Sequence, residues 1–185
     1  MGEIRIVEPV VRICAVISKY PDARQWAIEQ LRQRWGQIFL NSEPLPFVAN
    51  GFYTETMGEP LMKQLVAFYD VVEPGTLAEW KHETNAIEDA WAAQTRTPES
   101  RPLNLDSGYI TQAKLVLATT KDRDHRIYLR DGMFAEVTLN YVGKKWIHHR
   151  WSYPDYRTPR VAEFATDCRN HLRRHILETG QWRRV

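Results

Sequence analysis

The part of the chain that most constrains the fold is residues 104–156, because strand patterns follow one another there with only short turns between them. Residues 133–141 alternate between two sets of side chains, as a strand with two different faces does. Asp131-Gly132 before this run predicts a tight hairpin turn, and Gly143 predicts another turn after it. An antiparallel meander of about four strands is therefore expected, at 114–120, 125–129, 133–141 and 145–153.

The first half of the chain alternates strand and helix patterns. Asp22 is a candidate N-cap and Gly36 a candidate helix end, while Thr76 is expected to open a second helix and Thr158 with Pro159 a last one. Asn, Asp, Ser and Gly at 104–108 predict a turn. Strands are expected at 10–18 and 38–47, helices at 22–35 and 76–91, and loops at 50–60 and 92–102. The apolar residues of 61–72 permit a helix or a strand, and this segment is taken as a strand.

This order of elements predicts an α+β fold. Strand, helix, strand, strand, helix, strand is the ferredoxin-like split βαβ pattern. We expect a mostly antiparallel sheet with that split βαβ start, the C-terminal β-meander and a final helix, with helices packed on one face of the sheet. Residues 1–185 are expected to form a single domain whose last six or so residues are frayed.

Composition indicates an ordinary globular chain, with 43% hydrophobic and 26% charged residues and a net charge of +2. No stretch approaches about 18 continuous apolar residues, so no membrane span is expected. Cys14 and Cys168 have no metal-binding spacing, and the N-terminus does not resemble a secretory signal. These features predict a cytoplasmic protein.

One group of candidate site residues lies on the second helix. Lys81, Asn85 and Glu88 are spaced at i, i+4 and i+7, directly beside the stripe predicted to be buried. They are therefore expected to point sideways along the sheet. They form either a solvated row or one wall of a site.

The other candidates lie in the C-terminal strands. Glu136 and Thr138 share a strand face by period two, and Arg126 is the expected partner if Glu136 is buried. If the polar set is a site, the helix residues must face Glu136 from the same side of the sheet, with Asn104 and Asp106 at the rim. The candidate ligand-binding residues are Lys81, Asn85, Glu88, Asn104, Asp106, Lys121, His125, Arg126 and Glu136.

Several long motifs resemble a known bacterial family, domain of unknown function 4416. They are NLDSGY (104–109), LVLATTKDRDHRIYL (115–129), GMFAEVTLNY (132–141) and WSYPDYR (151–157), with FYTETMGEPL (52–61) and KHETNAIE (81–88) upstream. The sequence departs from the family pattern at Ser107, Met133 and Phe134. The resemblance favours a strand over a helix at 61–72, and it implies no reaction. Some members of the family carry a GTP-binding label, but this chain has no GxxxxGK[ST] loop.

The sequence contains no GxGxxG, GxSxG or HExxH motif, so no reaction is predicted. No metal site is assigned. Glu88, Asp106 and Glu136 have the oxygen ligands that Mg²⁺ prefers, but the favoured interpretation is that each forms an ion pair with a nearby Lys or Arg.

We expect a polar pocket for an anionic small molecule, a nucleotide or a phosphorylated metabolite. One alternative is an RNA-binding module, based on the aromatic and basic run 146–151 and the arginine-rich last helix. Another is a protein-interaction domain with exposed Trp151, Tyr153 and Tyr156.

Overall fold

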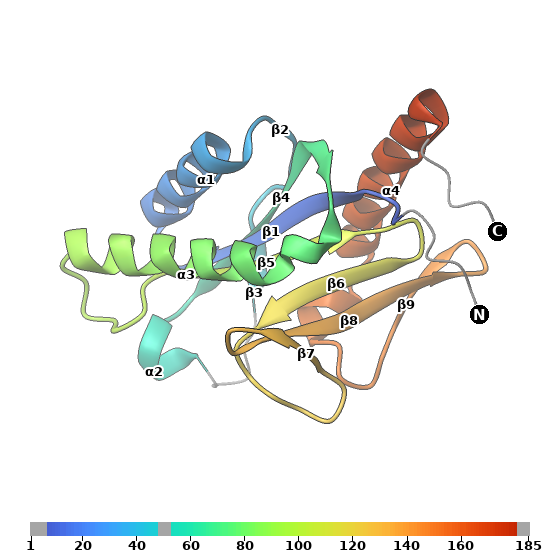
Figure 1. The fold of residues 1–185 in the computed structure, drawn as a ribbon. Helices are drawn as coiled ribbons and strands as arrows, with labels where there is room; N and C mark the ends of the chain where they lie inside the picture. Colours follow the sequence, from blue (N-terminus) through green and yellow to red (C-terminus); the bar gives the residue numbers. More distant parts are fainter. Residues whose placement is uncertain (1–6, 48–52, 181–185) are drawn as a thin grey trace.

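The computed structural model of this chain describes residues 7–47 and 53–180. Within these ranges nine strands form one sheet, in the order β2-β4-β1-β5-β6-β8-β7, with β3 beside β4 and β9 beside β8 (Figure 1). The strands are β1 Val10–Ser18, β2 Ile38–Asn41, β3 Leu45–Phe47, β4 Leu61–Val72, β5 Asn104–Ile110, β6 Lys114–Thr119, β7 Ile127–Arg130, β8 Met133–Val142 and β9 Lys145–His148. The helices are α1 Pro21–Trp35, α2 Thr54–Met57, α3 Leu77–Gln94 and α4 Pro159–Thr179, with short 3₁₀ turns at Pro74–Thr76 and Pro154–Arg157.

The predicted α+β fold with a mostly antiparallel sheet is confirmed. Strand β1 lies between β4 and β5, and all the pairings between strands are antiparallel in this part of the chain. Strand β4 therefore separates β1 from β2, and β1 separates β4 from β5, which is the split βαβ arrangement. The continuous apolar character of β1 predicted this central position.

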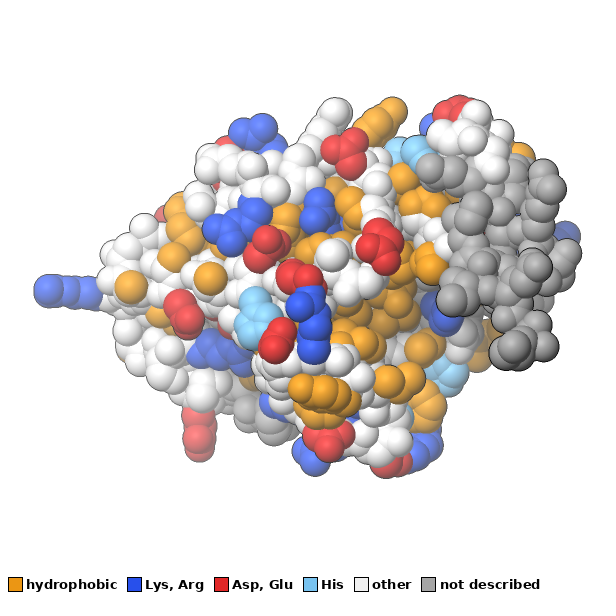
Figure 2. Space-filling view, in the orientation of Figure 1, with side chains coloured by type: hydrophobic (Ala, Val, Ile, Leu, Met, Phe, Trp, Pro, Cys, Tyr) orange, Lys and Arg blue, Asp and Glu red, His pale blue; other side chains and the backbone are white. Residues whose placement is uncertain are grey.

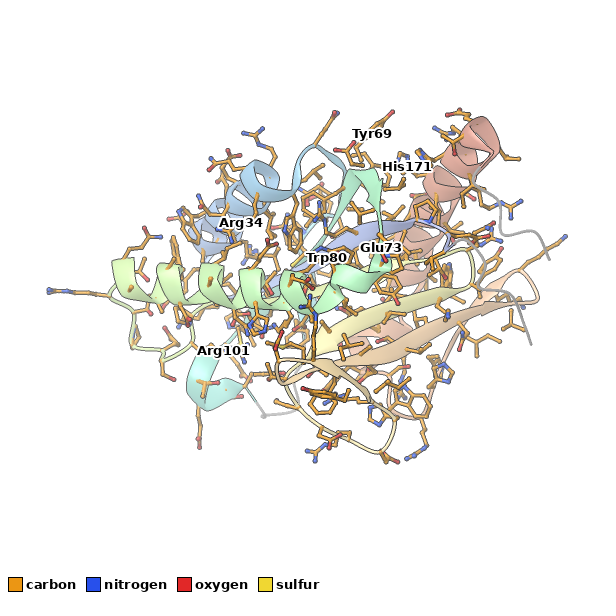
Figure 3. The ribbon with its side chains drawn as sticks, in the orientation of Figure 1. Arg34, Tyr69, Glu73, Trp80, Arg101 and His171 are labelled. Atoms are coloured by element: carbon orange, nitrogen blue, oxygen red, sulfur yellow. The ribbon has the colours of Figure 1, made fainter. Side chains whose placement is uncertain are left out.

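Two hydrophobic cores cover the two faces of the sheet. Helices α1 and α3 lie on one face, where Leu31, Trp80 and Ile87 pack against Val16 and other strand residues (Figure 1). Helix α4 lies on the opposite face and buries its apolar stripe there: Val161, Phe164, Ala165, Cys168, Leu172 and Ile176. The final helix is thus docked on the sheet as expected, but across from the other two. His171 on α4 and Tyr69 on β4, both labelled in Figure 3, form one contact between this helix and the sheet. His171 Nε2 lies 2.8 Å from the Tyr69 carbonyl oxygen.

Helix boundaries follow from proline and glycine rather than from the predicted cap. Helix α1 begins at Pro21, and its N-cap Tyr20 makes no side-chain hydrogen bond to the helix. The prediction that Asp22 is the N-cap is wrong, because Asp22 lies within the first turn, where a carboxylate favourably meets the helix dipole. The end predicted at Gly36 is confirmed, with φ of 94° at that residue.

Three predicted loop or terminal segments differ in detail. The loop expected at 50–60 contains the short helix α2, while residues 50–52 lie outside the described part. The loop expected at 92–102 begins later, because α3 continues to Gln94. At the C-terminus, Gly180 is the left-handed cap of α4, and the predicted fraying falls on residues that the structure does not describe.

The turn predicted at 104–108 is wrong, because these residues form strand β5. Strand β5 pairs with β1 along its whole length, but with β6 only through Gly108, Tyr109 and Ile110. A Cβ on Gly108 would lie 2.3 Å from the Val116 carbonyl oxygen, so glycine permits this close approach. Past Gly108 toward its N-terminus, β5 separates from β6, and the sheet is open on that side.

Strand β8 is the centre of the C-terminal strands, with β6 on one side and β7 and β9 on the other. The regular alternation predicted through 133–141 is interrupted at Thr138, which has no partner on β6 between the pairs of Val137 and Leu139. As a result Val137 packs against the core under α3, whereas Leu139 belongs to the core under α4.

Strand β9 ends at His148 rather than at 153 as predicted. The chain turns there because the Ser152 hydroxyl accepts from the His149 amide at 2.8 Å and donates to the Thr138 carbonyl at 2.5 Å. None of the helices in the described ranges has the length and apolarity that crossing a membrane requires.

Candidate functional site

A cavity of about 360 Å³ lies where β5 and β6 separate. This volume is within the range of small-molecule sites. Its walls come from α3, the loop before β5, β5 itself, the end of β6, the segment before β7, β8 and the turn before α4. The lining residues are Tyr53, Lys81, Asn85, Glu88, Asp89, Arg101, Asn104, Asp106, Leu117, Ala118, Thr119, Thr120, Lys121, Arg126, Glu136, Tyr153 and Tyr156.

The open edge of β5 is capped by side chains of α3 instead of by another strand. Lys81 Nζ donates to the Leu105 carbonyl at 2.7 Å, and the Leu105 amide donates to Glu88 Oε1 at 2.8 Å. Lys81 Nζ and Glu88 Oε1 are 3.6 Å apart, so the two side chains also form an ion pair. Both side chains therefore satisfy backbone groups that a missing strand would otherwise pair. Asn85, the third predicted site residue on α3, has no hydrogen-bond partner within the ranges described.

A chain of hydrogen bonds crosses the cavity wall from Glu88 to Asp106. Arg101 donates to Glu88 Oε2 from Nε at 3.2 Å and from Nη2 at 2.9 Å, and it also donates to the Asn104 side-chain oxygen. The Asn104 amide in turn donates to Asp106 Oδ1 at 3.1 Å. Figure 3 shows Arg101 between α3 and α2, and its backbone amide donates to the Thr56 carbonyl. The chain fixes the orientation of Arg101, Asn104 and Asp106.

A second cluster surrounds the buried Glu136 on β8. Glu136 Oε2 accepts from Arg126 Nε at 2.9 Å and lies 3.0 Å from His125 Nε2, while Oε1 accepts from the Thr138 hydroxyl. The predicted ion pair of Arg126 with Glu136 is therefore present. Arg126 Nη1 donates to the Lys121 carbonyl at 2.9 Å, which leaves Nη2 without a partner in the described part of the chain.

Positive charge accumulates at the outer end of the cavity. Lys121 and Arg126 come from the connection between β6 and β7, Arg101 comes from the loop before β5, and all three line the cavity. The pKa of Lys121 is lowered, first by burial and then by the positive charges of Arg101 and Arg126; Asp106 opposes the shift. Burial, with Asp106 as the next cause, raises the pKa of Tyr53 to about 12. The cations therefore repel one another, and a bound anion would relieve this repulsion.

The aromatic residues of the alternative hypotheses are mostly engaged in the fold. The Trp151 ring is stacked between His125, at 4.9 Å between ring centroids, and His149, at 4.6 Å. Tyr156, expected to be exposed, is buried, whereas Tyr153 is exposed as predicted. Trp146 donates its indole N–H to Thr166 of α4. On the face across which α3 runs, acidic and basic side chains are interspersed, as Figure 2 shows.

Eight of the nine predicted site residues line the cavity, and the ninth, His125, contacts Glu136 from outside it. The arrangement required of the site, with the helix residues and Glu136 on the same side of the sheet, is wrong. Asn104 and Asp106 lie on strand β5 and line the cavity. Glu136 pairs with Leu117, which belongs to the core under α4, so Glu136 is on the opposite face of the sheet from α3. The helix residues and Glu136 still meet in one cavity, because the sheet is open between β5 and β6.

The predicted set omitted several residues that the cavity contains. Arg101 lies in the loop predicted at 92–102, but its place thirteen residues after Glu88 gave no sign of their contact. Tyr53 and Tyr156 come from segments distant in sequence and had no local signal. Among the described residues, no three His, Cys, Asp or Glu side chains are grouped as metal ligands.

The fold and the cavity together define an α+β protein with a polar site at a break in its sheet. Comparison with protein families matches residues 8–172 to the family described as domain of unknown function 4416. This match spans most of the chain, so the protein belongs to the DUF4416 family, as its motifs predicted. Comparison of this chain with curated proteins and with solved structures found no significant match.

Proposed function

We propose that this protein binds an anionic small molecule, a nucleotide or a phosphorylated metabolite, in the cavity between β5 and β6. The observation that supports this most directly is the convergence of Lys121, Arg101 and Arg126 on one cavity. Burial comes first among the causes that lower the pKa of Lys121, and the positive charges of Arg101 and Arg126 follow, so a bound anion would favour the charged form of this lysine. An anion of matching size would stabilise this arrangement.

The hydrogen-bond donors suit a group with several acceptor oxygens. Arg101 and Arg126 are each held by a carboxylate, yet Nη1 of Arg101 and Nη2 of Arg126 donate to no residue in the described ranges. Guanidinium groups oriented in this way are suited to phosphate oxygens. The amide of Asn85 faces the same cavity and adds a donor or an acceptor.

RNA binding is the alternative function. Base stacking needs an accessible ring face, and the Trp151 ring is already stacked with two histidine rings, those of His125 and His149. The interspersed charges of Figure 2 also differ from a continuous basic surface. The geometry therefore favours a small anion. A cytoplasmic location fits the free thiols of Cys14 and Cys168.

Thermal unfolding in the presence of orthophosphate, pyrophosphate, ribose 5-phosphate and nucleotides tests the proposal. A ligand at a hundred times its Kd adds about 2.7 kcal/mol of stability. For a chain of this length that corresponds to a rise in Tm of roughly 5–10 °C. Lys121→Gln should reduce or abolish the rise. Lys114→Gln, which removes a charge from the exposed start of the adjoining β6, should not.

Two results would contradict the proposal. One is the absence of any stabilisation by all four kinds of anion. The other is an equal loss of the effect in Lys121→Gln and in Lys114→Gln, which would indicate a nonspecific response to net charge. Binding of single-stranded RNA that weakens steeply with salt, without competition from small phosphates, would favour the alternative function.

A further inference from the structure

Asp106 presents a carboxylate oxygen to the cavity that nothing in the described part of the chain pairs. Its Oδ1 accepts from the Asn104 amide at 3.1 Å, and that amide is itself held by Arg101. Its Oδ2 makes no hydrogen bond, and no cationic group in the described ranges lies within ion-pair distance of either oxygen. The carboxylate is thus fixed in orientation, but half of its accepting capacity is unused.

An unpaired carboxylate in an anion site is unfavourable for a ligand that consists only of phosphate. An ionised Asp can accept hydrogen bonds but cannot donate them, so it repels phosphate oxygens and attracts hydroxyl groups. Acidic side chains bind the ribose hydroxyls of dinucleotides in this way. The presence of Asp106 beside three cations therefore indicates a ligand with two chemically different ends.

The positions of these groups give the orientation of such a ligand. Lys121 is exposed and follows the end of β6, so the anionic end belongs at the outer part of the cavity. Asp106 lies on the α4 face of β5, the face on which Tyr156 is buried. Its charge is the first cause after burial of the raised pKa of Tyr156, which places it toward the inner part.

We infer that the cavity takes a phosphate monoester of a polyhydroxylated compound, with hydroxyl groups bound by Asp106 and the phosphate at Lys121. This inference rests on the proposed function, since it assumes that the cations bind the anion. Asn104 acts as a positioning residue, because its amide directs the second oxygen of Asp106 into the cavity. A sugar phosphate and a mononucleotide share the required chemistry.

The test compares orthophosphate, ribose 5-phosphate and AMP as ligands of the wild type and of Asp106→Asn, by isothermal titration calorimetry. Wild type should bind ribose 5-phosphate more tightly than orthophosphate. Asp106→Asn should weaken ribose 5-phosphate by about ten- to a hundredfold, the range for a hydrogen bond to a charged group, because an amide oxygen accepts less strongly. The same variant should bind orthophosphate with unchanged or higher affinity, because a negative charge is removed from the cavity.

The matched control is Asp122→Asn, which removes the same charge from an exposed residue in the turn beside Lys121, outside the cavity lining. Asp106→Ser, which leaves out the carboxyl group, provides a second variant if the first is poorly folded by circular dichroism. Tighter binding of AMP than of ribose 5-phosphate would identify a nucleotide as the ligand, and the reverse would identify a sugar phosphate; both agree with the inference.

The results separate this inference from the proposed function. If Asp106→Asn binds both orthophosphate and ribose 5-phosphate more tightly than wild type does, Asp106 acts only through its charge. The inference is then overturned, while the proposed anion site stands. If wild type binds orthophosphate as tightly as ribose 5-phosphate, the inference is also overturned. If wild type binds none of the three ligands, the proposed function fails with it.

Discussion

Lys63 offers the sharpest test of the energetics of this fold. It lies on β4 with its side chain almost completely buried, and Nζ is 2.5 Å from Asp155 Oδ2, in the turn before α4. The ammonium also lies 3.2 Å from the centroid of the Tyr156 ring. Burial lowers the pKa of Lys63 despite the opposing effect of Asp155. The ion pair therefore does not fully recover the free energy of desolvation.

Two substitutions with opposite expected results follow from this geometry. Lys63→Met leaves Asp155 partly buried without its cation, which should lower the free energy of unfolding by about 3–5 kcal/mol. The corresponding fall in Tm is about 6–20 °C. The double variant Lys63→Met with Asp155→Leu removes both charges and should lie close to the wild type, or above it, because apolar side chains need no desolvation.

Urea denaturation followed by tryptophan fluorescence and by circular dichroism provides the measurement. The reasoning would be refuted if Lys63→Met alone cost less than about 1 kcal/mol, the range of exposed pairs. It would also be refuted if the double variant lost the sum of the two single losses, since that would show two independent contributions. Arg32→Met, which breaks an exposed ion pair with Glu29 on α1, is the matched control and should change stability little.

Two further predictions concern the cavity and the break in the sheet. Because the pKa of Lys121 is lowered, this side chain loses its charge at a lower pH than an ordinary lysine does, and the affinity for an anion should fall as pH rises through that pKa. Titration calorimetry with orthophosphate above pH 8, where the ligand stays dianionic, measures this affinity. Wild type should show the fall, and Lys121→Gln should not. Gly108→Ala would bring a Cβ to 2.3 Å from the Val116 carbonyl and should lower the free energy of unfolding by about 1–3 kcal/mol; equal stability of this variant and wild type in urea would contradict the close approach of β5 and β6.

The sequence predicted the elements whose patterns are local. Strand β1 begins and ends where its apolar run does, and the stripe of α4 follows directly from helical spacing. Residues 61–72 permit a helix or a strand by pattern, and the family resemblance favoured the strand that β4 forms. Strand β5 could not be predicted in this way. Its Asn, Asp, Ser and Gly residues favour turns in isolation, but here Asp106 lines a cavity and Gly108 permits close strand packing. Tertiary context decided between the two structures.

The candidate site was predictable in its members but not in its geometry. Spacing on α3 identified residues beside the buried stripe, and burial of Glu136 required a cation such as Arg126. The face of the sheet on which Glu136 lies depends on strand register, which one bulge can change. The contact of Arg101 with Glu88 depends on how a loop folds back, and no periodicity encodes it.

The capping of β5 by Lys81 and Glu88 separates two tasks within one cavity. These two side chains hold the framework, since their polar atoms are bound to the backbone of Leu105 and to each other. Asn85, Asp89 and Thr120 line the same space from α3 and from the turn after β6, without pairing any strand. Changes at these three positions can therefore alter which molecule fits without disturbing the sheet. Under the proposed function, a protein with this scaffold could change its ligand at these positions while the helix that closes the sheet stays the same.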